Sequence, residues 1–154
     1  MIAIAAVNPF DWRTVVLARH AQHVVLIHFP IALYIAGVAL DLAGRWLNRQ
    51  SLGDAAYYNF ALAAAFVIPA AATGLIAWQW QLEGQTLKGI LLQHLIAGLC
   101  AAAGIVMTWV VLFRARRKND PAPPVRFVLE AAVTIAVIVA GHLGGFVSGV
   151  NGLN

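Results

Sequence analysis

Near the end of the chain stands the stretch Ala140-Gly141-His142-Leu143-Gly144-Gly145-Phe146-Val147, within the last of four long apolar segments. It places an imidazole inside a helix of membrane-spanning length, where polar groups are expensive and usually functional. On a regular helix Gly145 and Gly149 share the face of His142, because they follow it by three and seven positions. Such a face, a ring nitrogen above bare backbone, suits a flat ligand or the close approach of another helix.

The composition around this stretch indicates a membrane protein. Hydrophobic residues make up 62% of the 154 residues, and charged residues only 10%. A bilayer span needs about 20 apolar residues, and the connections between the apolar runs are short enough for antiparallel neighbours. The sequence therefore predicts an all-α, integral membrane four-helix bundle, with spans at about 24–45, 56–80, 89–113 and 126–149.

The N-terminal segment, 1–22, is too polar to span a bilayer. Trp12 and its apolar neighbours predict a short interfacial helix in this segment, with Arg13 and Arg19 facing head groups or water. We therefore divide the chain into an N-terminal interfacial segment, 1–22, and one bundle domain, 23–154.

The distribution of basic residues predicts the orientation of the bundle. Three of them, Arg13, Arg19 and Lys88, fall on one side of the membrane. Seven fall in the first and third connections, on the other side: Arg45, Arg49, Arg114, Arg116, Arg117, Lys118 and Arg126. The positive-inside rule then puts the first and third connections in the cytoplasm and both termini outside. The basic net charge is thus a topology signal, and we expect no nucleic-acid partner.

Three histidines fall at one predicted depth on three different helices. A rise of 1.5 Å per residue places His28, His94 and His142 roughly 6–10 Å below the outer surface. His94 lies above a stripe of small residues that begins with Gly98, as His142 lies above Gly145. His23 and His28 are about 140° apart around a regular helix, so they point in different directions. Imidazoles from three helices at one depth predict a binding site.

A b-type haem is the ligand that these residues suit best. It needs two neutral imidazoles from facing helices, small residues beside the porphyrin and cations near its propionates. Arg13, Arg19 and Lys88 are on the correct side for the propionates. The predicted cofactor-binding residues are His23, His28, His94, His142, Gly98, Gly145, Gly149 and Arg19.

Three other readings of the same histidines stay open. A copper or zinc ion needs three or four converging nitrogens, which His28, His94 and His142 could supply. A quinone site needs a histidine and aromatic walls, and Phe29 and Trp78 are candidates for the walls. In the structural alternative, the imidazoles hydrogen-bond backbone carbonyl groups and hold the bundle together.

The chain carries none of the common catalytic motifs. It has no Gly-x-Ser-x-Gly elbow, no phosphate-binding glycine loop and no Cys-x-x-Cys, since Cys100 is the single cysteine. We therefore assign no catalytic residues and expect an electron-transfer or anchoring subunit. Asp41 and Glu130 lie near the inner ends of their spans, where we expect water to reach Glu130.

The sequence resembles a family of bacterial four-helix membrane proteins, the domain-of-unknown-function family 2231. The resemblance rests on His23-x4-His28-Phe29-Pro30, on Thr73-Gly74-Leu75 and on Gly141-His142-Leu143-Gly144-Gly145, and it covers about residues 22–152. It implies a four-helix inner-membrane protein, and relatives that carry c-type cytochrome domains imply redox work.

Together these observations predict a haem-binding electron-transfer subunit. It would link a periplasmic c-type cytochrome or dehydrogenase to quinone, with other membrane subunits and the lipid bilayer as its neighbours. The alternative is a non-catalytic anchor or assembly subunit of a larger complex.

Overall fold

Four long helices form the bundle of the computed structural model, which describes residues 19–81, 84–121 and 123–149. They are α2 (Arg19–Trp46), α3 (Gln50–Gln81), α4 (Gly89–Lys118) and α5 (Arg126–Val147). Each contains a stretch long and apolar enough to cross a membrane. Helices suit this environment because they satisfy their backbone hydrogen bonds internally, without water. The predicted four-span bundle is confirmed, and the described residues contain no strand.

The observed helices differ from the predicted spans mainly in length. The third and fourth begin at Gly89 and Arg126, as predicted, while α2 already begins at Arg19. Residues 19–22 of the proposed interfacial segment therefore belong to α2. Residues 1–18, with Trp12 and Arg13, lie outside the described residues.

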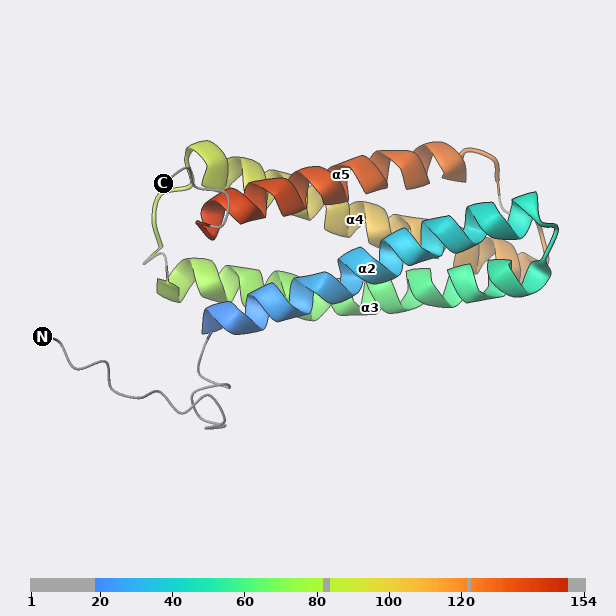
Figure 1. The fold of residues 1–154 in the computed structure, drawn as a ribbon, viewed down its shortest axis with the longest axis horizontal. Helices are drawn as coiled ribbons and strands as arrows, with labels where there is room; N and C mark the ends of the chain where they lie inside the picture. The colour runs from blue at the N-terminus through green and yellow to red at the C-terminus, as the bar shows by residue number, and fades with distance from the viewer. Residues whose placement is uncertain (1–18, 82–83, 122, 150–154) are drawn as a thin grey trace, which may run out of the picture.

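The helices pack as two hairpins, α2 with α3 and α4 with α5, which lie side by side along the bundle (Figure 1). The starts of α2 and α4 and the ends of α3 and α5 form one end, here named the histidine end. The opposite end, with Arg45, Arg116 and Arg126, is named the arginine end. Between the hairpins, α3 and α4 make the closer contact.

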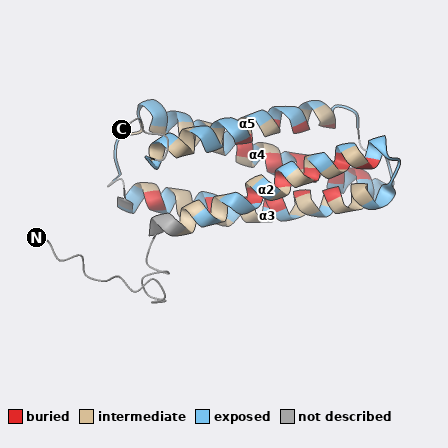
Figure 2. Cartoon of the chain, viewed as in Figure 1, coloured by how far each residue is buried: buried red, intermediate tan, exposed pale blue. Residues whose placement is uncertain are grey.

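The core of the bundle is concentrated toward the arginine end (Figure 2). Tyr34 and Phe60 are fully buried, and their ring centroids lie 5.3 Å apart. The Tyr34 hydroxyl lies 3.1 Å from Thr108 Oγ1, which joins α2 to α4 across the two hairpins. The buried residues of α4 are Ala101, Ile105, Thr108, Leu112 and Ala115, and those of α5 are Arg126, Glu130, Val133 and Val137.

This distribution leaves the histidine end without a packed interior in the second hairpin. No residue of α4 before Ala101 is buried, and none of α5 after Val137. Both helices are described over their full length, so the difference is a property of their packing. The predicted histidines lie in this less packed half.

Candidate functional site

His94 is held against α5 near the histidine end. Its Nδ1 atom lies 3.0 Å from the carbonyl oxygen of Ala140. A carbonyl oxygen only accepts hydrogen bonds, so Nδ1 must donate, and the neutral ring then carries its lone pair on Nε2. A Cβ atom at Gly144 would come within 3.0 Å of His94 Cε1, so glycine is what allows the ring to lie on α5.

His23 makes the corresponding contact in the first hairpin. Its Nδ1 atom lies 3.1 Å from the carbonyl oxygen of Ala70 and 3.3 Å from Thr73 Oγ1. Because the Ala70 carbonyl oxygen only accepts, His23 Nδ1 is the donor to it, and the Thr73 hydroxyl donates to carbonyl oxygens of α3. A Cβ atom at Gly74 would come within 2.9 Å of His23 Cε1. Both half-buried imidazoles thus dock onto a glycine of the other helix in the same hairpin.

His28 and His142 lie differently, because both side chains are exposed. His28 donates from Nδ1 to the carbonyl oxygen of Val24, four positions earlier on α2. The His142 ring meets the ring of Phe146 edge to face, with centroids 5.1 Å apart. The predicted walls of a quinone site both lie in the first hairpin, where Phe29 stacks on Phe66 and Trp78 donates to the Gln85 carbonyl oxygen.

The predicted binding glycines lie in different surroundings. Gly149 lies beyond the end of α5 with a φ of +78°, so it cannot share a helical face with His142, and that prediction is wrong. A Cβ atom at Gly98 would meet no atom within 4 Å, so this glycine does not mark a close contact. Gly145 is half-buried within α5. The side chain of Arg19 lies outside the described residues.

Sequence reasoning did not single out Gly144 as the glycine under an imidazole. Spacing within α5 favoured the face of His142, whereas the ring that needs space comes from α4. The sequence does contain a signal for this contact. The number of residues from His23 to Gly74 differs by only one from the number from His94 to Gly144.

The described residues contain no group of three or more histidine, cysteine, aspartate or glutamate side chains that could hold a metal ion. His28, His94 and His142 are therefore not gathered into the cluster that a copper or zinc site would need. Each hairpin instead uses its docked histidine within its own pair of helices.

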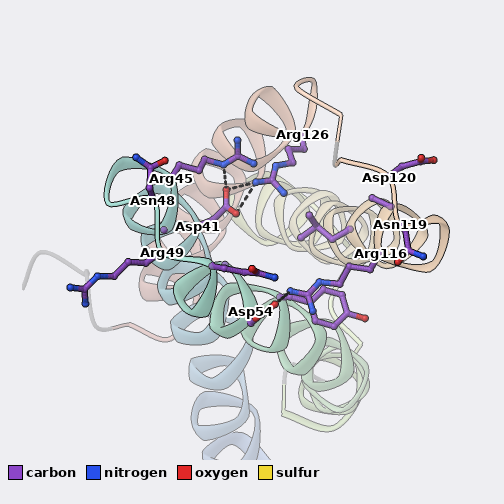
Figure 3. A pocket seen from close by; sticks show the side chains of 15 residues that line it. Asp41, Arg45, Asn48, Arg49, Asp54, Arg116, Asn119, Asp120 and Arg126 are labelled. Atoms are coloured by element: carbon purple, nitrogen blue, oxygen red, sulfur yellow. Dashed lines mark hydrogen bonds and ion pairs between the residues drawn. The ribbon is translucent and has the colours of Figure 1, made fainter.

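A polar cleft of about 720 Å³ opens at the arginine end, between α2, α3 and α4 (Figure 3). Arg126 and Asp41 form a buried ion pair at its wall, with Arg126 Nη2 2.7 Å from both carboxylate oxygens. Arg45 adds a contact of 3.0 Å from Nε to the same carboxylate. Across the cleft, Arg116 pairs with Asp54 and lies over the Tyr57 ring.

Glu130 lies one turn after Arg126 on α5, and its surroundings differ from those that we expected. It is only 2% exposed, and neither carboxyl oxygen has a hydrogen-bond partner among the described residues. Arg126 Nε is 3.9 Å from the nearer oxygen. The expectation that water reaches Glu130 is wrong, because depth along the helix says nothing about its face: Glu130 shares the inward face of α5 with Val133 and Val137.

Comparison with known proteins gave one family match. The family model described as a predicted membrane protein, DUF2231, matches residues 19–153. No curated protein and no solved structure matches the chain. The matched range contains all four helices and both docked histidines.

Proposed function

The chain belongs to the family of predicted membrane proteins DUF2231, and we propose that it is an electron-transfer subunit that binds b-type haem at the histidine end. The ligands are two of the imidazoles that the sequence singled out, with His94 as the first. The histidine end faces the periplasm, as the seven-to-three distribution of basic residues supports.

The observation that carries this proposal is the hydrogen bond from His94 Nδ1 to the Ala140 carbonyl oxygen, 3.0 Å long. A histidine that ligates a metal usually donates its other N–H to a carbonyl or carboxylate group, which fixes the tautomer and the ring orientation. With Nδ1 donating to the Ala140 carbonyl oxygen, Nε2 is the ring nitrogen of His94 that is left to ligate iron. The Nδ1 atom of His23 donates to the Ala70 carbonyl oxygen in the same way.

The packing of the bundle supports a bulky ligand at this end. In α4 and α5 the buried residues stop at Ala101 and Val137, before the helices reach the histidine end. A porphyrin needs apolar walls and small residues beside it. The segments of α4 and α5 between these two residues and the histidine end are mostly apolar. The exposed Lys88, directly before α4, is a cation suited to a propionate.

Haem also agrees with the number of ligands that the bundle offers. Iron in a b-type haem takes one or two protein ligands, because the porphyrin supplies four nitrogens. A bare copper or zinc ion would need three or four protein ligands at one point. Once bound, the haem would supply one-electron chemistry, which suits a relay between a periplasmic cytochrome or dehydrogenase and quinone. The protein residues bind and orient the group and keep bulk water away from it.

The alternative function is that of an anchor or assembly subunit. Large apolar side chains are exposed on all four helices, and the less packed half at the histidine end would accept a helix of another subunit. In that case the bonds from His23 and His94 to carbonyl oxygens serve only to hold each hairpin closed.

A dithionite-reduced minus air-oxidised absorption spectrum of the detergent-purified chain separates these functions, with iron, copper and zinc measured on the same sample. Haem binding predicts a sharp α-band and near-stoichiometric iron, both lost in His94→Ala while the protein still inserts. Expression with added haem precursor excludes limiting supply. Copper or zinc without haem would move the histidines to a metal site, and a featureless spectrum without metal would support the anchor.

A further inference from the structure

The two hairpins have the same internal pattern. Each of the five buried positions of α4 follows a buried position of α2 at one constant separation. Three of these pairs are Tyr34 and Ile105, Gly37 and Thr108, and Asp41 and Leu112. In the same way, each of the four buried positions of α5 follows a buried position of α3 at a constant separation. This separation is one residue shorter than that between α2 and α4, and Phe60 and Glu130 are one such pair.

Helical periodicity alone would let some offset align two buried faces, so an independent marker is needed. The ends of α2 and α4 provide one. Asn48 and Asn119, which have the same separation as Tyr34 and Ile105, are the only described non-glycine residues with positive φ, at 51° and 53°. Their N–H groups donate to the carbonyl oxygens of Arg45 and Arg116, at 3.2 and 3.1 Å. The two helices therefore end in the same way at the same register.

The docked histidines provide a second marker. His23 and His94 again have the separation that relates α2 to α4, and the glycines beneath their rings, Gly74 and Gly144, have the one that relates α3 to α5. In each hairpin the carbonyl oxygen that accepts from Nδ1 belongs to the residue four positions before that glycine. The other two placed histidines have no such counterpart, since Leu99 stands at the position equivalent to His28, and Ala72 at that equivalent to His142.

From this repeat we propose that His23 and His94 are equivalent ligands, and that they hold one b-type haem between the two hairpins. The assignment rests on the haem function proposed above and names its ligand pair. It differs from the sequence-based prediction, which drew the ligand pair from His28, His94 and His142. Both hairpins run in the same direction, so equivalent residues lie at the same end of the bundle.

The chemistry of haem iron suits such a pair. In some membrane proteins parallel repeats are related by a rotation about an axis along the bundle. Under such a relation, equivalent residues of the two hairpins would approach a ligand between them from different sides. His23 and His94 would then hold the haem iron with one imidazole each, and no third side chain would be required.

The test uses the full chain, purified with haem, and four single variants: His23→Ala, His94→Ala, His28→Ala and His142→Ala. Electron paramagnetic resonance of the oxidised protein reports whether the iron is low-spin with two imidazoles. We expect His23→Ala and His94→Ala each to lose at least nine-tenths of the low-spin signal. His28→Ala and His142→Ala, the matched controls, keep it. Added free imidazole restores the low-spin signal in the two ligand variants, which a purely structural role of the ring would not produce.

Two further variants keep the test decisive if the alanine variants fail to insert. In His23→Met and His94→Met a sulfur can still ligate the iron, so we expect a retained haem with a raised reduction potential. If the wild-type chain holds haem and His28→Ala or His142→Ala loses the signal while His23→Ala keeps it, the pair is wrong and the haem function stands. If the wild-type chain holds no haem even when it is expressed with added haem precursor, the ligand pair and the haem function are both wrong.

Discussion

Arg126 and Asp41 join α5 to α2 through two contacts of 2.7 Å between one guanidinium nitrogen and both carboxylate oxygens. Their side chains are 7% and 8% exposed, so the ion pair is shielded from water. The two residues come from different hairpins, and the pair is therefore a direct tie between the halves of the bundle.

We predict that Asp41→Leu destabilises the bundle by about 3–5 kcal/mol, because it leaves the buried Arg126 charge without its closest partner. Thermal unfolding in detergent, followed by circular dichroism, measures the loss. The repeat suggests the control: Leu112 and Ala56 stand at the positions equivalent to Asp41 and Arg126. The double variant Asp41→Leu/Arg126→Ala removes both charges and should be more stable than Asp41→Leu alone. A double variant less stable than the single one would show that the loss in Asp41→Leu does not come from an unpaired Arg126 charge.

A methyl group added at Gly144 should displace the His94 ring. The new Cβ atom would lie 3.0 Å from Cε1, so the ring would have to shift by a few tenths of an ångström from the position in which it contacts the Ala140 carbonyl oxygen. We expect Gly144→Ala to destabilise by about 1–3 kcal/mol, as overpacking does, and to weaken haem retention. Gly98→Ala is the matched control, because its Cβ atom would meet nothing within 4 Å. Equal effects of the two substitutions on unfolding temperature and haem content would argue against a docked ring.

Gly104 of α4 packs against Val133 of α5, where an added Cβ atom would overlap the Val133 Cγ2 atom. Gly104→Ala should therefore separate the helices of the second hairpin and lower the unfolding temperature. Val133→Ala in the same chain frees space on the facing helix, so the double variant should recover part of the loss. A double-mutant cycle measures this coupling, and additive effects would show that the two positions do not meet.

The predicted orientation can be measured with single cysteines in a Cys100→Ser background. Gln85 and Asp120 are exposed residues in connections at opposite ends of the bundle. With both termini in the periplasm, a membrane-impermeant maleimide should label Gln85→Cys in intact cells. It should label Asp120→Cys only after the membrane is opened. The reverse pattern would invert the topology and place the histidines at the cytoplasmic face.

The spans of the bundle could be predicted because length and hydrophobicity determine them directly. The helices α4 and α5 begin at Gly89 and Arg126, where the third and fourth apolar segments begin. Depth along each helix followed as well: His94 lies near the start of α4 and His142 near the end of α5, and these two helix ends lie at the same end of the bundle (Figure 1).

The face that each helix turns inward could not be predicted in the same way. In a membrane both lipid and core are apolar, so hydrophobic periodicity does not separate them. The depth of Glu130 along its helix was therefore predicted correctly, but the prediction that water reaches its side chain was wrong. Gly98 and Gly149 were chosen by their spacing from a histidine on their own helix, whereas Gly74 and Gly144 receive a ring from the neighbouring one.

The direction of the two hairpins bears on how such a chain could arise. Each hairpin enters and leaves at the histidine end, and the connection 82–88 joins the last residue of the first to the start of the second. A gene for one hairpin could therefore be copied and fused in frame without turning either copy over in the membrane. Before that fusion, a homodimer of hairpins would already have presented one histidine from each subunit. In the other hairpin, apolar residues stand at the positions equivalent to Asp41, Arg126 and Glu130. These polar residues would then mark positions at which the fused copies diverged.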